Sequence, residues 1–336
     1  MNHIYIGGYT RRDSKGIYHM TLENGQLSPA ELVAKVQNPT YLQVDPLNHK
    51  LYCNNSAAEG HNISSFQIEA DGSLSKLADS ASKNPNACYL ALDKENEKIY
   101  STVYSTAVFE VRSFDKVTGH IFNVEYSVKT QGGGPNKERQ DGSHLHIAYP
   151  HDRYIFICDL GSDQILVLDR KSFQLLHSVA VEPGCGPRHI VIQGNKAYVI
   201  TELNNHLIEL DYDAETGNLQ PVKYFPTLPH DFTGLSQGAA IRFGKHPHTL
   251  YVSNRGHNSI TVFRLNTDGS VHGPIQNIST HGDWCRDFNI TPDGEFLIAA
   301  HEKSDHVSLF HIAQDGSLKF LSNHITVPEG TGVAIL

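Results

Sequence analysis

The sequence predicts an all-β chain folded as a seven-bladed β-propeller, and three observations support this. Short apolar strand cores recur seven times, helical periodicity is nearly absent, and a Gly-containing turn follows most of the cores. At 336 residues the chain is long for one ordinary pair of packed layers. Because the repeats run through the whole chain, we expect one closed domain over residues 1–336 and not two separate domains.

The strand cores set the length of the repeat. They read HIYIGGY, KLYCNNS, KIYSTVY, RYIFICDL, KAYVITEL, TLYVSNR and EFLIAAH, and their leading residues are Tyr5, Tyr52, Tyr100, Phe156, Tyr198, Tyr251 and Leu297. The first and last of these are 292 residues apart, which over six intervals gives about 48.7 residues per repeat. Repeats of roughly 40–50 residues are typical of propeller blades.

Each repeat contains segments that predict four strands. A short strand such as YLQVDP or HIVIQG precedes the core, and an alternating segment such as ISSFQI or ITVFRL follows it. A turn such as Asn24-Gly25, Asp71-Gly72 or Asp268-Gly269 then leads into a further strand. We therefore expect four-stranded antiparallel blades.

The two ends of the repeat pattern predict how the ring closes. The first repeat starts at the core HIYIGGY without a preceding strand, whereas the last repeat is complete and leaves GVAIL at residues 332–336. This segment should supply the missing strand of blade 1, which would remove two exposed sheet edges. Residues 122–142, the longest polar and Gly-rich interval, predict an outer strand followed by an inserted loop.

Composition and charge narrow the choice of partners. The net charge of −9 argues against nucleic acid and anionic membranes, although a local basic pocket for a small anion remains compatible with it. Neither a signal-like start nor an apolar run of about 18 residues is present, so we expect a cytoplasmic protein. Five widely spaced cysteines without CxxC fit a reducing compartment and no structural zinc. The oligomeric state stays open.

Two positions of the repeat do not follow the apolar pattern of the strands. One lies four residues after the leading core residue, and the other opens the innermost strand, 10–12 residues before it. The charged and histidine residues there are Glu202, Arg255 and His301 at the first position and His144, Arg188 and Arg286 at the second. In a propeller these strand ends meet at one mouth of the central channel, so we expect the six side chains to converge. His146 shares a strand with His144, and a one-residue step decides which imidazole points inward.

These residue types suit an anion-binding, acid–base site. Arginine gives a two-pronged, permanently charged contact to phosphate or carboxylate, while His and Glu can exchange protons near neutral pH. The competing interpretation is a set of structural ion pairs. The pairs HLH at 144–146 and HPH at 246–248 lack further ligands, so we expect no metal there. The hydrolysis considered below would need no organic cofactor either. A GxSxG nucleophile motif is absent.

Several stretches carry a family resemblance. They are IYIGGYTRRDSKGIY, GPRHIVI with ITELNN, YVSNRGHNSITVF and DFNITPDGEFLIAAHEKSDHVSLF. Over essentially its whole length the chain resembles the lactonase family of seven-bladed propellers, whose best-known members are 6-phosphogluconolactonases. The resemblance implies catalytic roles for His144, Arg188, Glu202 and Arg255. We expect Arg286, His146 and His301 to bind the substrate.

The resemblance implies hydrolysis of a sugar lactone, with 6-phosphogluconolactone of the pentose phosphate pathway as the first choice. His144 or Glu202 would act as general base, one of Arg188 and Arg255 would face the oxyanion, and the other would bind phosphate with Arg286. Two alternatives remain: a propeller that binds a ligand or protein without catalysis, and a lactonase or cycloisomerase for another acidic lactone.

Overall fold

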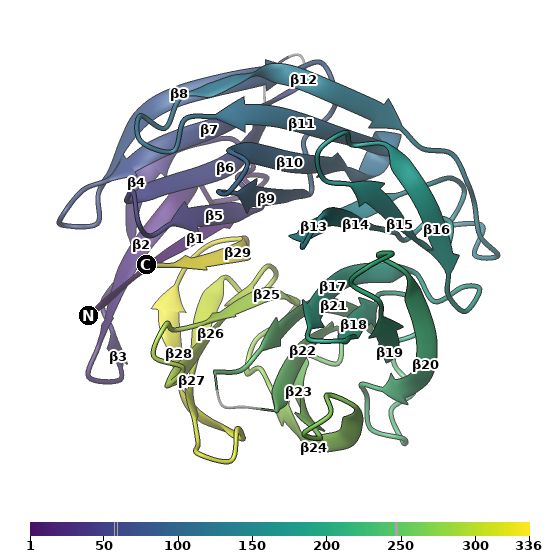
Figure 1. The fold of residues 1–336 in the computed structure, drawn as a ribbon. Coiled ribbons are helices and arrows are strands. Elements are labelled where there is room, and N and C mark those ends of the chain that lie inside the picture. The colour runs from purple at the N-terminus through teal and green to yellow at the C-terminus, as the bar shows by residue number, and fades with distance from the viewer. Residues whose placement is uncertain (57, 59, 246–247) are drawn as a thin grey trace.

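Seven antiparallel β-sheets stand around a common axis in the computed structural model (Figure 1). The structure describes every residue from 1 to 336 except 57, 59, 246 and 247, so most of the HPH pair lies outside the described residues. The predicted seven-bladed propeller is confirmed.

The strands follow the repeat in chain order. Blade 1 contains β29 (Gly330–Ile335), β1 (Asn2–Gly8), β2 (Gly16–Glu23), β3 (Gln26–Leu27) and β4 (Glu31–Lys35), and blade 2 contains β5 (Leu42–Asp45), β6 (Lys50–Ser56), β7 (His61–Ile68) and β8 (Leu74–Ser82). Blade 3 contains β9 (Tyr89–Asp93), β10 (Lys98–Val103), β11 (Val108–Phe114) and β12 (Ile121–Lys129), with the 3₁₀ turn η1 (Tyr104–Thr106) after β10. Blade 4 contains β13 (Leu145–His151), β14 (Tyr154–Asp159), β15 (Gln164–Asp169) and β16 (Leu175–Ala180).

The remaining blades repeat this plan. Blade 5 contains β17 (Pro187–Gln193), β18 (Lys196–Thr201), β19 (His206–Tyr212) and β20 (Leu219–Pro226), and blade 6 contains β21 (Gln237–Phe243), β22 (Thr249–Arg255), β23 (Ser259–Leu265) and β24 (Val271–Ser279). Blade 7 contains β25 (Cys285–Ile290), β26 (Phe296–His301), β27 (His306–Ile312) and β28 (Leu318–Thr326). Only blade 1 departs from four strands, because β2 pairs with both the two-residue β3 and β4.

The leading residues of the strand cores are buried, and their contacts explain why several of them are tyrosines. All seven are at most 1% exposed, and they lie on the second strand of their blades. The hydroxyls of Tyr5 and Tyr251 donate to the carbonyls of Gly72 and Gly316, each in the outer turn of the next blade, at 2.9 and 2.6 Å. In these two blades the aromatic ring therefore fills the core of its own blade while the hydroxyl bonds to the neighbouring blade.

The last strand closes the ring as predicted. Strand β29 pairs antiparallel with β1, with Ile4 opposite Ile335 and Ile6 opposite Val333 (Figure 1). The amide of Val333 also donates to the carboxylate of Asp287 in β25, at 3.2 Å. Blades 1 and 7 are thus joined through backbone and side chain, and β1 has no free inner edge.

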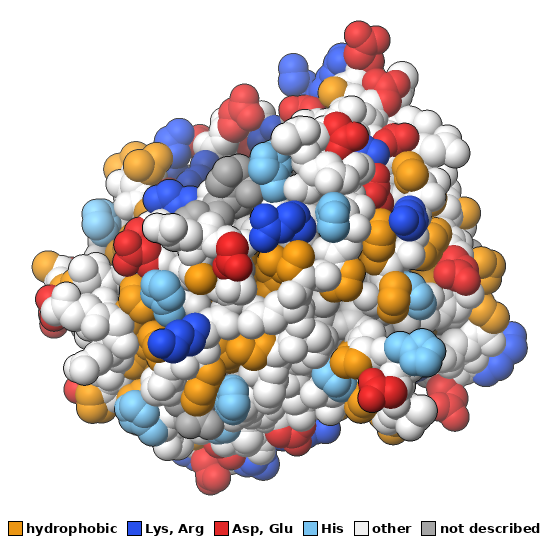
Figure 2. All heavy atoms as spheres, turned by 90° about the horizontal axis from the view of Figure 1, so that it is seen from below, with side chains coloured by type: hydrophobic (Ala, Val, Ile, Leu, Met, Phe, Trp, Pro, Cys, Tyr) orange, Lys and Arg blue, Asp and Glu red, His pale blue; other side chains and the backbone are white. Residues whose placement is uncertain are grey.

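The predicted insertion lies next to the channel mouth. Strand β12 is the outer strand of blade 3, and a loop over residues 130–144 leads from it to β13. No helix in the described part of the chain is long and apolar enough to cross a membrane. On the side of the ring seen in Figure 2, acidic, basic, histidine and apolar side chains are interspersed.

Candidate active site

A cavity of about 630 Å³ opens at one mouth of the channel. Its wall is built from strand starts and strand ends of several blades, as the repeat pattern predicts, and from the inserted loop. The lining residues used below are Tyr9, Arg11, Tyr104, Arg139, His146, Glu202, Arg255, Trp284, Arg286 and Glu302. This volume suits a small-molecule ligand.

β-Bulges decide which side chains of the inner strands face the mouth. In β17 the register slips around Arg188, in β25 it slips around Arg286, and in β13 two residues, His146 and Ile147, lie opposite one. A bulge inserts an extra residue and redirects its side chain. His146 precedes Phe156 by 10 residues, as Arg188 precedes Tyr198, so His146 and Arg188 hold equivalent positions in neighbouring blades.

Glu202 lies at the centre of an arginine cluster. Its carboxylate accepts from Nε of Arg188 at 3.0 Å and lies 2.7 Å from an Nη of Arg255. A third guanidinium, that of Arg139, contacts the other carboxylate oxygen. Arg188 and Arg255 are 2–3% exposed and Glu202 is 4% exposed, so these charges interact in a poorly hydrated environment.

The electrostatics of Glu202 argue against a role as proton acceptor. Burial alone would raise the pKa of this carboxyl, but Arg255, Arg188 and Arg139 outweigh it and hold the pKa of Glu202 far below its usual value. A carboxylate so strongly stabilised as an anion is a poor general base near neutral pH. The arrangement instead makes Glu202 the anchor that orients the guanidinium groups.

The turn before β17 sets the position of Arg188. Gly186 has a φ of +62°, and a Cβ atom there would approach the side chain of Leu203 to 2.7 Å, so this turn requires glycine. The carbonyl of Gly186 accepts from the amide of Glu202 at 2.8 Å. Burial and then Arg255 and Arg286 lower the pKa of Arg188 to about 9. Arg188 stays charged at neutral pH and lies behind the cavity, against Glu202.

His146 reaches the cavity as a neutral imidazole. Burial, followed by the positive charges of Arg188, Arg286 and Arg255, lowers the pKa of His146 well below its ordinary value. Its Nδ1 is buried and has no hydrogen-bond partner among the described residues. A buried ring nitrogen without a partner is costly unless a ligand or water completes it. An anion bound beside the arginines would offset the charges that lower the basicity of His146.

His144 lies outside the lining of the cavity. Its ring stacks on Tyr104 with 4.4 Å between ring centroids, and its Nδ1 lies 3.0 Å from the carbonyl oxygen of Tyr104. Its Nε2 lies 2.9 Å from the carboxylate of Asp141. Both nitrogens are thus engaged, and the structure places His144 behind Tyr104, where it supports the wall.

Of the two other expected substrate-binding residues outside this cluster, one lines the cavity and one does not. Arg286 lies in the wall, beside Tyr9. His301 is fully buried in blade 7, where its Nε2 lies 2.9 Å from the hydroxyl of Ser308 and its ring contacts His306. The repeat position of His301 is equivalent to that of Glu202, but its side chain turns outward into the blade.

The sequence did not predict several contributors to the site, among them Arg11 at the rim and the two residues that contact the Glu202 cluster. Arg139 lies in the inserted loop, where no other blade offers an equivalent position for alignment. Trp284 precedes β25 and lines the cavity between two cations, with Arg255 and Lys303 lying 5.6 and 3.4 Å from its ring centroid. The charged segment Lys137-Glu138-Arg139 in the insertion and the single tryptophan of the chain were the available signals.

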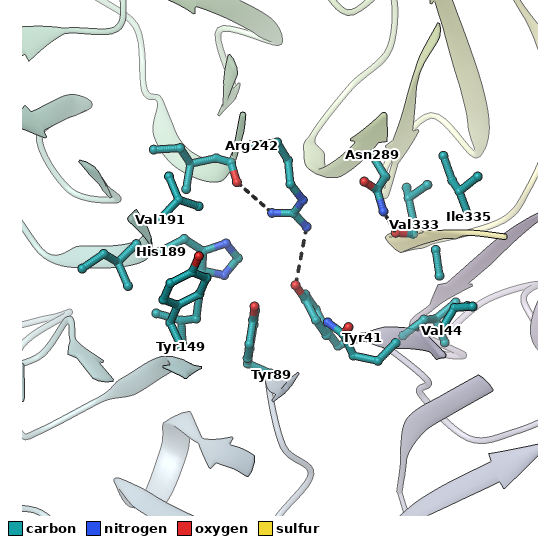
Figure 3. A pocket seen from close by; sticks show the side chains of 16 residues that line it. Tyr41, Val44, Tyr89, Tyr149, His189, Val191, Arg242, Asn289, Val333 and Ile335 are labelled. Atoms are coloured by element: carbon teal, nitrogen blue, oxygen red, sulfur yellow. Dashed lines mark hydrogen bonds between the residues drawn. The ribbon is translucent and has the colours of Figure 1, made fainter. Parts of the chain in front are cut away.

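A second, smaller chamber lies further along the channel axis (Figure 3). Tyr41, Tyr89 and His189 point toward its centre, and Arg242 contacts Tyr41 and pairs with Asp287 at 2.9 Å. His189 also packs against His146, with 4.9 Å between ring centroids. The two histidines therefore separate this axial chamber of 260 Å³ from the cavity at the mouth.

Fold and site together define a seven-bladed propeller with an arginine-rich pocket at one end of its channel, and comparisons with known proteins identify the class. The family model described as lactonase, 7-bladed beta-propeller, matches residues 3–335. The chain belongs to this lactonase family.

Individual relatives match over nearly their whole length. The 6-phosphogluconolactonase of Bacillus subtilis is 33% identical over 347 aligned residues, covering 99% of this chain and 97% of that protein. A crystal structure of a protein from Lactobacillus plantarum has a TM-score of 0.93 at 34% identity and full coverage of both chains. A candidate 6-phosphogluconolactonase from Bacteroides fragilis has a TM-score of 0.89 at 25% identity, covering 100% of this chain and 98% of the other.

Proposed function

We propose that this protein hydrolyses 6-phosphogluconolactone to 6-phosphogluconate in the cavity at the channel mouth. The observation that carries the proposal is the local charge of that cavity. Arg11, Arg139, Arg188, Arg255 and Arg286 lie in or directly behind its wall against Glu202 and Glu302, which is five positive charges less two negative ones, or +3. The protein as a whole carries −9. Such a focused positive potential favours an anionic substrate.

His146 is the general base of the proposed reaction, because an anionic substrate bound beside Arg188, Arg255 and Arg286 offsets the charges that lower its basicity in the free protein. It takes a proton from a water molecule, whose oxygen attacks the lactone carbonyl carbon to give a tetrahedral oxyanion. When this intermediate collapses, the bond from the carbonyl carbon to the ring oxygen breaks, and His146 returns the proton to that oxygen. The products are a hydroxyl and a carboxylic acid, which releases its proton to solvent near neutral pH to give the carboxylate, and neither oxidant nor reductant is consumed.

The arginines of the Glu202 cluster stabilise the oxyanion. Arg255 and Arg139 line the cavity and retain donors beyond those that contact Glu202, so they can face the developing negative charge. Arg188 lies behind them and contributes to the field without contacting substrate. Glu202 holds the guanidinium groups in place, which reduces reorganisation when charge develops.

The test is a comparison of two lactones. Hydrolysis of freshly prepared 6-phosphogluconolactone and of unphosphorylated gluconolactone should be followed with the purified protein and corrected for spontaneous ring opening. We expect a clearly higher kcat/KM for the phosphorylated lactone. Equal values for both lactones would contradict the assigned substrate, and rates at background for both would contradict lactone hydrolysis of this class.

A further inference from the structure

Two arginines of the cavity differ from the others in having no carboxylate partner. Arg139, Arg188 and Arg255 all contact Glu202. Among the described residues, the side chains of Arg11 and Arg286 have neither an ion pair nor a hydrogen bond, and both lie near the ring of Tyr9, at 3.6 and 5.9 Å from its centroid. Their guanidinium donors are therefore available to a ligand.

Tyr9 supports these two side chains without neutralising them. It follows β1 directly and lines the cavity together with both arginines. The face of an aromatic ring attracts a guanidinium, but such a contact is weak and leaves the N–H donors of the guanidinium unpaired. An anion that binds both guanidinium groups would add charge-assisted hydrogen bonds, which are stronger than the contacts with the ring.

The loop that carries Arg11 is fixed by its backbone. The carboxylate of the buried Glu329 accepts from the amides of Arg11, Arg12 and Ser14, at 3.2, 2.8 and 3.3 Å. The backbone is thus held at the rim of the cavity, while the exposed side chain of Arg11 is free to change rotamer. Arg286 starts from a bulge in β25 and is partly buried, so it forms the fixed half of the pair.

We propose that Arg11 and Arg286 form a phosphoryl-binding subsite, separate from the Glu202 cluster at which the lactone opens. Arg286 receives the phosphoryl oxygens from inside the cavity, and Arg11 closes over them from the rim. This inference rests on the proposed function, because it assigns the distal phosphate of the same substrate. It makes Arg11 a specificity-determining residue that lies outside the aligned positions of the repeat.

The kinetic test uses Arg11→Ala with Lys15→Ala as its control. Lys15 is an exposed cation of the same loop that does not line the cavity, so the two variants remove the same charge. We expect Arg11→Ala to lower kcat/KM for 6-phosphogluconolactone about ten- to a hundredfold, mainly through KM. The effect on gluconolactone should be much smaller, and Lys15→Ala should resemble the unmodified protein with both.

A binding test separates this inference from the proposed function. The dissociation constants of 6-phosphogluconate and gluconate, measured by calorimetry, require no turnover. We expect the unmodified protein to favour 6-phosphogluconate and Arg11→Ala to lose about ten- to a hundredfold of that preference. If the variant kept the full preference, or lost affinity for both acids equally, the subsite would be refuted even for an active lactonase. The unmodified protein could also prefer 6-phosphogluconate, lose that preference in Arg11→Ala, and yet hydrolyse neither lactone. That result would refute the proposed function and support the subsite.

Discussion

At the scale of single residues, Glu202 faces three guanidinium groups with one negative charge. Removing that charge in Glu202→Gln would leave Arg188 and Arg255 buried without a counter-ion. Breaking a buried ion pair in this way costs about 3–5 kcal/mol. We expect the melting temperature of Glu202→Gln to fall markedly, and inorganic phosphate to restore part of the loss by binding the arginines.

The control for this prediction is Asp211→Asn, because the side chain of Asp211 is 58% exposed and its partner Lys196 keeps a second carboxylate partner in Glu209. Its melting temperature should change little. If Glu202→Gln were as stable as this control yet inactive, Glu202 would act as the base and not as an anchor.

His144 and His146 provide a matched pair of imidazoles. His146→Ala should lower kcat about 10²–10⁴-fold, the usual contribution of a general base. His144→Ala should have a smaller effect, because His144 lies behind Tyr104 and acts on the site only through that residue. Steady-state kinetics of the two folded variants measure the difference. A larger loss of kcat in His144→Ala than in His146→Ala would indicate that His144 is the catalytic base.

The pH profile offers an independent measure of His146. Its pKa in the free protein is lowered, so the imidazole stays unprotonated and active well below pH 6.5. A bound anion offsets the charges of Arg188, Arg286 and Arg255 and should raise this pKa in the complex. The acid limb of kcat/KM, which reports the free protein, should therefore lie at lower pH than the acid limb of kcat. Coinciding limbs would exclude this coupling.

At the scale of strands, the starts of the innermost strands show which part of the site the sequence predicts and which part it does not. The spacing of the cores can be recognised because a large buried side chain recurs, aromatic in six blades and Leu297 in the seventh. This spacing predicted that Arg188, Glu202, Arg255 and Arg286 meet at the same mouth. Which of His144 and His146 faces the cavity depends on a bulge in β13, and no residue type in that strand predicts the bulge. Arg139 could not be predicted by aligning the repeats, because its loop occurs in one blade only.

Strand β29 allows a direct test of ring closure. Val333 is 3% exposed and packs between β1 and β25, whereas Val222 in the outer strand β20 is 51% exposed. Val333→Asp buries a charge at the closure and should lower the melting temperature strongly, while Val222→Asp should change it little. Equal effects of the two substitutions in thermal denaturation would show that closure does not limit stability.

At the scale of the whole molecule, buried histidines link stability to pH. Burial and then the neighbouring His306 lower the pKa of His301 to about 3, and burial also lowers those of His61, His146 and His189. The unfolded chain binds protons below about pH 6.5, and the folded protein does not. Stability is therefore complete above that pH and falls on acidification, by up to about 1.4 kcal/mol per pH unit for each such histidine.

Denaturant unfolding between about pH 6.5 and 5 measures this slope, because most carboxyl groups stay ionised in both states there. His301→Gln should reduce the slope by up to about 1.4 kcal/mol per pH unit. An unchanged slope in His301→Gln would mean that His301 is accessible to protons in the folded state.

The overall architecture was predictable for a physical reason that the site does not share. Tyr5, Tyr198 and Tyr251 each fill the core of one blade and donate a hydrogen bond to the turn of the next. The other leading residues fill the same buried position in their own blades, so the pattern recurs in the sequence and can be recognised. The site breaks that repetition, since each blade contributes a different side chain at equivalent positions. Their location can be inferred by alignment, but their partners depend on the folded geometry.

The pairing of β29 with β1 also has a consequence for biosynthesis. Gly330 follows its partner Gly8 by 322 residues, so ribosomes that add about 5–20 residues per second need roughly 15–65 s to make one partner after the other. Throughout that interval the inner edge of β1 has unpaired amide and carbonyl groups beside a hydrophobic strand. The nascent chain is therefore most open to mispairing and to chaperone binding at its oldest strand, and only the arrival of β29 ends this exposure.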